Sequence, residues 1–347
     1  MTPWPISSGS SSWAHYCWKR VAGDDMKRRL AAAFVIACLA LSTVAKAEEF
    51  TFVALGDMPY GPQEQAYPAF KTLIAEINRR APVFTFHLGD TKSGTEPCSD
   101  RLLLEQFVFF NFLASSVFYT PGDNEWTDCH RLLAGAYDPL DRLRFIRTHF
   151  FPTDESLGGQ PIRIERQADV MPGFEPFVEN SRFNWRGVWF VTAHVVGSNN
   201  NFDAVEGSDA TEEFLARDEA NRVWLADSFD KAEAAGADAV VVAIHADMFG
   251  DGFDPQQESF ARVSGFKGFA ETLVSKAKSF RKRVFLLFGD SHVYRVFHPF
   301  PRSAGNLTAV EVYGAEHMHA VEIAVRLRPS LMFTFAPLLN PALPAPP

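Results

Sequence analysis

The sequence contains five apolar runs that each end in an aspartate or a histidine. Four of them end in Gly-Asp: FTFVALGD at Phe50–Asp57, VFTFHLGD at Val83–Asp90, VFYTPGD at Val117–Asp123 and VFLLFGD at Val284–Asp290. The fifth, AVVVAIH at Ala239–His245, ends in histidine. Such short apolar runs predict buried strands. Ligand sites of parallel α/β sheets form beyond the carboxyl ends of the strands, so we expect the five ends to converge on one point, where several such groups usually bind metal.

Helical periodicity fills most of the intervals between these strands. It predicts amphipathic helices at 63–80, 100–114, 138–150, 209–236 and 258–278. Residues 152–179 predict a long irregular segment, 183–196 predict two strands, and 308–313 with 320–326 predict an antiparallel pair. Because no long linker interrupts this alternation, we expect one domain at 48–337 with two packed mixed sheets flanked by helices, and a Pro-rich tail at 338–347.

Residues 26–47 have the layout of a secretory signal peptide. A Lys-Arg-Arg cluster, an apolar run and the small-residue sequence Ala-Lys-Ala follow Met26 in that order. The run is shorter than the ~20 residues that a membrane span needs, so no stable membrane association is expected. We interpret residues 1–25 as an upstream extension and expect cleavage near Ala47 and a periplasmic or secreted protein. A lipoprotein cleavage box at 35–38 is the alternative, but the apolar run continues past Cys38.

Cleavage near Ala47 changes the charge and the cysteine content. Residues 1–47 carry 6 basic and 2 acidic side chains, so 27 of 33 basic and 40 of 42 acidic residues remain, a net charge of −13. Such a chain should repel nucleic acid, and no nucleic-acid partner is expected. Cys98 and Cys129 are the two cysteines left, and in an oxidising compartment they predict a disulfide; two unpaired buried thiols are the alternative.

Taken in order, the strand-end motifs resemble those of the calcineurin-like metallophosphoesterases. They are GDMPY at Gly56, GDTKSG at Gly89, PGDNEW at Pro121, AIHADMF at Ala243 and GDSH at Gly289. The resemblance extends over residues 50–326. It implies a four-layer α/β/β/α sandwich of two mixed sheets that holds two metal ions. It also implies a small phosphorylated substrate that is attacked by a metal-activated water.

The resemblance further implies a role for individual residues. The implied metal ligands are Asp57 and His292 at the first ion, Asp123, His245 and Asp290 at the second, and Asp90 as the bridge between them. Asp90 and Asn124 are the implied catalytic residues. Lys92 and Asn124 are the implied substrate contacts.

Four positions depart from the family pattern. Pro59 stands where the first motif has a ligand histidine, and Asn124 stands where the third has the histidine that aids the leaving group. Asp123 replaces a ligand asparagine, and Asp290 replaces a ligand histidine. Tyr60 could substitute as a ligand, although its position is not the equivalent of the ligand tyrosine in purple acid phosphatases.

These departures change the charge and the chemistry of the expected site. Two divalent ions and four aspartates are formally neutral together, so the centre attracts a phosphate dianion less than a site with two aspartates would. A trivalent ion, Lys92 or a nearby arginine could restore positive charge. Because oxygen ligands replace imidazoles, we expect one or two metal ions of the Mn, Fe, Mg or Ca kind rather than Zn.

The remaining histidines have two interpretations each. His87 is expected to be a hydrogen-bonded core residue, whereas His194 is open between core and pocket. His317 and His319 lie in a turn between two late strands, where they are open between substrate-side and structural roles.

The sequence leaves two functions to distinguish. The leading hypothesis is a secreted metal-dependent phosphoesterase. The alternative is a non-catalytic metal-binding or interaction module that keeps the same fold, because Pro59 and Asn124 replace a ligand histidine and the leaving-group histidine.

Overall fold

The first three apolar runs form the centre of a six-stranded sheet in the computed structural model, which describes residues 49–203, 207–250, 252–327 and 329–346. The predicted signal peptide and upstream extension lie outside these residues. The strands are β1 (Glu49–Leu55), β2 (Phe84–His87), β3 (Ser116–Tyr119), β4 (Leu157–Gly158), β14 (Ala320–Arg326) and β15 (Met332–Leu338). β1, β2 and β3 run parallel, and the other three are antiparallel to their neighbours, in the order β15-β14-β1-β2-β3-β4.

The two later apolar runs lie in a second, seven-stranded sheet. Its strands, in spatial order, are β12 (Arg295–Phe297), β13 (Leu307–Glu311), β11 (Arg283–Phe288), β8 (Ala239–Ala243), β7 (Val188–Thr192), β6 (Ser181–Trp185) and β5 (Glu165–Arg166). β13, β11, β8 and β7 run parallel to one another. A separate two-stranded hairpin consists of β9 (Phe253–Asp254) and β10 (Ser259–Phe260).

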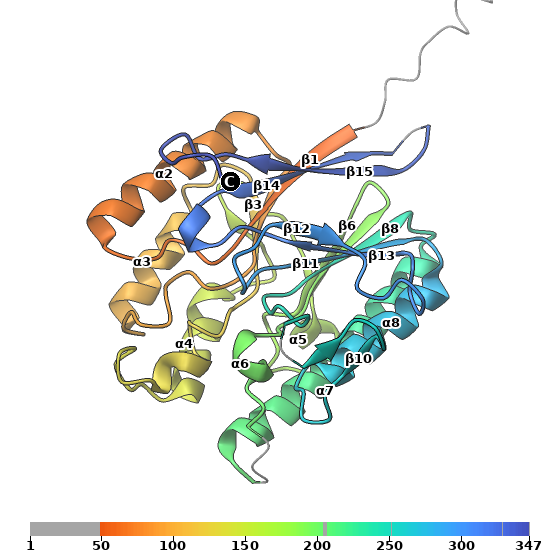
Figure 1. Cartoon of the computed structure of the whole chain (residues 1–347), viewed down its shortest axis with the longest axis horizontal. Coiled ribbons are helices and arrows are strands. Elements are labelled where there is room, and N and C mark those ends of the chain that lie inside the picture. The colour runs from red at the N-terminus through yellow and green to blue at the C-terminus, as the bar shows by residue number, and fades with distance from the viewer. Residues whose placement is uncertain (1–48, 204–206, 251, 328, 347) are drawn as a thin grey trace, which may run out of the picture. The chain divides into compact units, whose positions relative to one another are not determined.

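Helices cover the outer face of each sheet (Figure 1). The first sheet is covered by α2 (Gln63–Arg80), α3 (Asp100–Phe110) and α4 (Pro139–Phe150), and the second by α7 (Asp209–Ala234) and α8 (Lys267–Phe280). The short elements are α5 (Gln167–Val170), α6 (Gly197–Asn200) and the 3-10 turns η1 (Thr127–His130) and η2 (Ala315–His317). Ser208 caps α7, because its side chain accepts a hydrogen bond from the Thr211 amide. No helix in the described part of the chain is long and apolar enough to cross a bilayer.

The two sheets pack face to face through alternate residues of their strands. In β1, Phe50 and Phe52 face the second sheet, whereas Val53 and Leu55 face the helices. This alternation follows from the two-residue period of a strand, and both faces are apolar because both are buried. The layers are therefore α/β/β/α, as the sequence predicts.

Two predicted elements are wrong in their partners or bounds. The segments at 308–313 and 320–326 do not pair with each other: β13 runs parallel to β11 in the second sheet, and β14 runs antiparallel to β1 in the first. The intervening turn carries the chain from one sheet to the other. The helix predicted at 258–278 begins only at Lys267, because Ser259 and Phe260 form β10.

After β15, the buried Asn340 side chain donates to the Ala69 carbonyl of α2, so this part of the predicted tail packs against the domain.

Candidate metal centre

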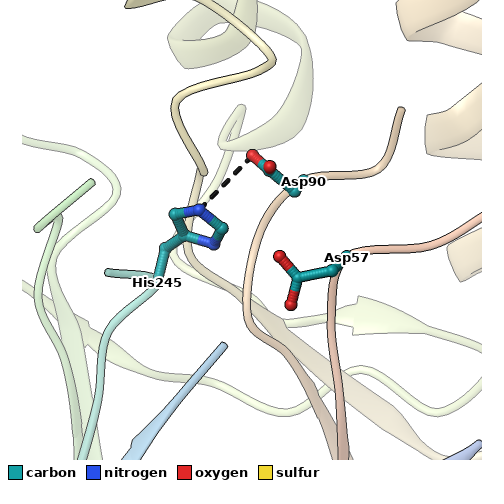
Figure 2. Close-up of side chains that lie close together, drawn as sticks. All are labelled: Asp57, Asp90 and His245. Atoms are coloured by element: carbon teal, nitrogen blue, oxygen red, sulfur yellow. Dashed lines mark ion pairs between the residues drawn. The ribbon is translucent and has the colours of Figure 1, made fainter. Parts of the chain in front are cut away.

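Three of the predicted ligands meet where β1, β2 and β8 end. Asp57, Asp90 and His245 point toward one another from the loops that follow these strands (Figure 2). Each offers one ligand atom, and these atoms all lie within 4.8 Å of one another. All three side chains are buried. The structure therefore brings together residues from three separate motifs.

A second group shares the same histidine. Asp123, His245 and Asp290 also have ligand atoms within 4.8 Å of one another. The His245 Nε2 atom lies 3.0 Å from Asp123 Oδ1, 3.5 Å from Asp90 Oδ1 and 3.8 Å from Asp290 Oδ1. Its Nδ1 atom lies 2.6 Å from the Leu88 carbonyl oxygen, which accepts a hydrogen bond from an Nδ1–H group. This bond orients the ring so that Nε2 faces the carboxylates, the usual arrangement for a metal-binding histidine.

His292 lies at the edge of the first group. Its Nε2 atom is 3.8 Å from Asp57 Oδ1, and its Nδ1 atom is 2.7 Å from Glu316 Oε2. The Tyr60 ring packs edge-on against it. The structure thus places all six residues predicted as ligands around one centre, and their coordination of metal remains a prediction.

The glycines of the Gly-Asp motifs make room for aspartates of other motifs. A Cβ atom on Gly122 would overlap the Asp90 carboxylate, and one on Gly289 would overlap the Asp57 carboxylate. Glycine is needed at both positions because the carboxylate of another motif approaches the backbone there. The aspartates themselves turn sharply after their strands: Asp57 has a φ of 57°, Asp90 of 52° and Asp290 of 78°. Such strained backbone is concentrated at functional sites.

The buried carboxylates make the centre electrostatically unfavourable without a cation. Burial raises the pKa of Asp57 and of Asp90 well above the ordinary range, and raises the pKa of Asp290 to about 6. Burial opposes protonation of His245, but the surrounding carboxylates, first Asp90, raise its pKa well above the ordinary value. Burial also acts to raise the pKa of Asp123, but the hydrogen bond and charge of His245 outweigh it and lower that pKa.

The donor set fits one or two metal ions. A cation among these carboxylates would relieve their mutual repulsion, as a bound ion does in metal sites generally. Carboxylate oxygens predominate over imidazole nitrogens in both groups, which favours hard ions over zinc.

Asn124 and Tyr60 form the rim beside Asp90. The Asn124 side-chain amide donates to the Asp90 carboxylate and to the Tyr60 hydroxyl, the latter at 2.9 Å. The Tyr60 hydroxyl donates to Asp90 Oδ2 at 2.8 Å. Burial, together with the charge of Asp90, raises the pKa of Tyr60 well above its ordinary value. Both side chains are therefore next to the predicted bridging ligand.

Glu125 holds the loops of the second and third motifs together, a role that the sequence did not reveal. Its buried carboxylate accepts hydrogen bonds from the amides of Asp90 (3.2 Å), Thr91 (2.6 Å) and Gly122 (3.0 Å) and from the Tyr119 hydroxyl (3.1 Å). Glu125 follows the third motif directly, so its place in PGDNEW is the one signal that could have drawn attention to it.

The geometry of Lys92 counts against the predicted phosphate contact. Lys92 is fully buried, and its ammonium group donates to the Ser93 carbonyl at 3.1 Å. Burial lowers its pKa, although Glu125 and Asp90 oppose that shift. With none of its surface exposed, the side chain is out of reach of a substrate in solution.

Ser198 contacts the centre from the Asn-rich segment at 197–201. Residues 198–201 have φ values of 49°, 51°, 55° and 60°, so they form a left-handed turn at α6. Asparagine tolerates this conformation better than other residues with side chains. The turn brings the Ser198 hydroxyl within 2.8 Å of Asp123 Oδ2 and 2.9 Å of Asp128 Oδ1. No sequence motif pointed to this contact.

The predicted disulfide between Cys98 and Cys129 is present, with a Cα–Cα distance of 5.7 Å. The two sulfur atoms lie 3.5 and 3.6 Å from the Asn124 carbonyl oxygen. The disulfide therefore supports the loop that carries Asn124.

His87, His194 and His319 have structural roles, whereas His317 lies in η2, where neither of its two interpretations is tested. His87 is buried, its Nε2 atom lies 3.3 Å from the Met58 carbonyl oxygen, and burial lowers its pKa to about 4. His194 is buried with its Nδ1 atom 2.8 Å from Glu179 Oε1, which places it in the core. The buried His319 accepts from the Asn340 amide and lies 3.1 Å from the Pro344 carbonyl oxygen through Nε2.

A cavity of about 440 Å³ adjoins the centre. Asp128 and Ser198 line it, and Ser198 also contacts the predicted ligand Asp123. Pro139, Leu140 and Phe202 also line it. Its volume is within the range of small-molecule pockets.

Solved structures with a similar fold include two phosphatases. A dimetal phosphatase from Danio rerio matches with a TM-score of 0.52 at 11% identity, over 84% of this chain and 99% of that chain. A purple acid phosphatase from yellow lupin (Lupinus luteus) seeds matches with a TM-score of 0.51 at 13% identity, over 84% of this chain and 52% of that chain, so this chain spans about half of the lupin protein. No protein-family model and no curated protein sequence matches the chain. The chain has the metallophosphoesterase fold that its motifs predict.

Proposed function

We propose that this protein is a metal-dependent phosphoesterase that hydrolyses small phosphate esters. The observation that carries the proposal is the pair of buried Asp/His groups that share His245 at the strand ends of this fold. Metal ions held there would lower the pKa of a bound water and neutralise charge on the phosphoryl oxygens. The bound ions would be of the Mn, Fe, Mg or Ca kind.

The chain's own residues would then have separate tasks. Asp90 would hold the two ions together because it lies between the groups of Asp57 and Asp123. Asn124 would orient the phosphoryl group through its amide, since it lies beside Asp90. The cavity lined by Ser198 and Asp128 would receive the alcohol portion of the ester.

The compartment belongs to the proposal as well. The predicted signal peptide and the Cys98–Cys129 disulfide both fit a secreted or periplasmic protein, because such bonds persist in oxidising compartments.

Turnover with defined metals tests the proposed activity. Protein lacking residues 1–47 would be loaded separately with Mn, Fe, Zn, Mg and Ca and assayed with activated aryl phosphate monoesters and diesters. We expect turnover with at least one hard ion and its loss in Asp90→Asn, whose metal content is measured in parallel. Activity that survives in Asp90→Asn at unchanged metal content would contradict the assignment of the site.

A non-catalytic metal-binding module is the second candidate. It is favoured by the Asn124 amide, which donates to Asp90 and Tyr60 where the family has a histidine for the leaving group. Metal binding without turnover of any ester, with every ion tested, would support this candidate over the first.

A further inference from the structure

Arg131 lies beside the amide of Asn124 at the rim of the candidate metal centre. A Cβ atom on Gly94 would lie 2.7 Å from Asn124 Oδ1 and 3.1 Å from Arg131 Nη1, so the amide and the guanidinium border the same small space. The amide nitrogen of Asn124 faces the other way, toward Asp90. Arg131 is therefore separated from the predicted bridging ligand by one side chain.

Two contacts hold the guanidinium in place. Its Nη1 atom lies 2.7 Å from Asp128 Oδ2, and its Nη2 atom donates to the Ser198 hydroxyl oxygen at 3.4 Å. Ser198 in turn contacts the predicted ligand Asp123. Arg131 thus lies near Asp90 through Asn124 and near Asp123 through Ser198. The Cys98–Cys129 disulfide anchors the same loop two residues before Arg131.

The guanidinium keeps donors for a ligand. Arginine has five N–H donors in a planar fork, and two of the nitrogens of Arg131 contact residues in the described part of the chain. Its side chain is about half exposed, at 49%, whereas Lys92 is fully buried. Of Lys92 and Arg131, a ligand can therefore reach Arg131.

We propose that Arg131 binds the phosphoryl group and favours phosphate monoesters, an inference that rests on the proposed function. A monoester dianion presents three non-bridging oxygens and a diester two, so a fork of N–H donors gains more hydrogen bonds from the monoester. The negative charge of Asp128 offsets the positive charge of Arg131 at long range. Arg131 therefore contributes to phosphate binding through directional hydrogen bonds at contact rather than through attraction at a distance.

Arg144 provides a matched control for the test. Both arginines are paired with an aspartate three residues earlier, Arg131 with Asp128 and Arg144 with Asp141. Arg144 is on α4 and is 69% exposed. Replacing either arginine with glutamine removes the same charge from the protein, but only Arg131 borders Asn124.

The experiment measures inorganic phosphate binding by calorimetry to metal-loaded wild type, Arg131→Gln, Arg131→Lys and Arg144→Gln, with metal content determined for each sample. We expect the dissociation constant of phosphate to rise by about 10- to 100-fold in Arg131→Gln, as for a lost charge-assisted hydrogen bond. Arg131→Lys should show a smaller rise and Arg144→Gln none. With p-nitrophenyl phosphate and bis(p-nitrophenyl) phosphate, kcat/KM should fall more for the monoester.

Several outcomes overturn the proposal. They are wild-type phosphate affinity in Arg131→Gln at equal metal content, an equal loss in Arg144→Gln, or no phosphate binding to the metal-loaded wild type. Should Arg131→Gln fail to fold, wild-type phosphate affinity in Arg131→Lys would also overturn the proposal, because lysine keeps the charge but lacks the planar fork of N–H donors. An absence of turnover with the expected affinity differences would reject the proposed function while keeping Arg131 as a phosphate-binding residue.

Discussion

Replacing Glu125 with glutamine tests whether this buried carboxylate sets the geometry of the centre. Its Oε2 atom accepts from the amides of Asp90 and Gly122, and its Oε1 atom accepts from the Thr91 amide and the Tyr119 hydroxyl. Glutamine keeps one acceptor oxygen and replaces the other with an amino group, which cannot accept. We expect the amino group to face Thr91 and Tyr119, because a hydroxyl can rotate to accept whereas an amide cannot.

The cost of Glu125→Gln follows from this arrangement. One buried N–H group, that of Thr91, loses its acceptor at a cost of about 1 to 3 kcal/mol. The bonds from Asp90 and Gly122 weaken by about 1 kcal/mol each, because the acceptor is no longer charged. Part of this loss is offset because a neutral amide is less costly to bury than a carboxylate. The free energy of unfolding should therefore fall by about 2 to 4 kcal/mol.

Denaturant unfolding and metal titration, each done with the matched variant Glu219→Gln, check this expectation. Glu219 is exposed on α7, so its replacement should change the free energy of unfolding by less than about 0.5 kcal/mol. Because Glu125 holds the backbone of Asp90, Glu125→Gln should also weaken metal binding by about 10- to 100-fold, as is usual for residues that support a ligand. Equal stability and equal metal affinity in Glu125→Gln and Glu219→Gln would refute the reasoning.

Three further predictions concern the disulfide, pH and the leaving group. Replacing Cys98 and Cys129 with serine should lower the free energy of unfolding, measured with denaturant, by about 3 to 4 kcal/mol for their separation of 31 residues. Because the sulfurs support Asn124, the replacement should also weaken phosphate binding more than metal binding, which calorimetry measures. The pKa of Asp290 is raised to about 6 and that of His245 is raised well above its ordinary value, so without metal the folded state binds more protons than the unfolded state. Thermal stability measured in chelator should therefore decrease as the pH is raised from about 5 to 8, whereas with bound Mn it should not. An increase of stability with pH in chelator would contradict the pKa directions. Asn124→His should increase kcat for aryl phosphates with poor leaving groups by up to about 10²-fold and leave good ones nearly unchanged; an unaltered dependence on leaving-group pKa would exclude a general-acid role at this position.

Five of the six residues expected at the centre could be found from the sequence because each stands at the end of an apolar run. The strand and its polar end are encoded within a few consecutive residues, as in Phe50–Asp57. Parallel strands bring their carboxyl ends to the same side, so Asp57 and Asp90 lie together at one edge of the first sheet. The packing of the two sheets then adds His245, which follows β8 of the second sheet. The four layers follow from the same local pattern, because strands buried on both faces need helices outside.

The sequence failed where a residue's environment comes from distant parts of the chain. β13 and β14 are neighbours in sequence and have similar apolar patterns, yet they lie in different sheets. Lys92 follows the second motif by two residues, but only packing shows that its ammonium group is buried.

The sequence by itself determined which side chains stand at the strand ends and that their number implies a metal. Only the tertiary structure decided how they are held: Gly289 gives room to Asp57, Glu125 joins two loops, and a left-handed turn brings Ser198 to Asp123. It also decided that Arg131, and not Lys92, is the cation that a ligand can reach beside Asn124. The physical reason is that a strand is specified by the alternation of its own side chains, whereas these contacts join residues as far apart as Asp57 and Asp290, 233 positions along the chain.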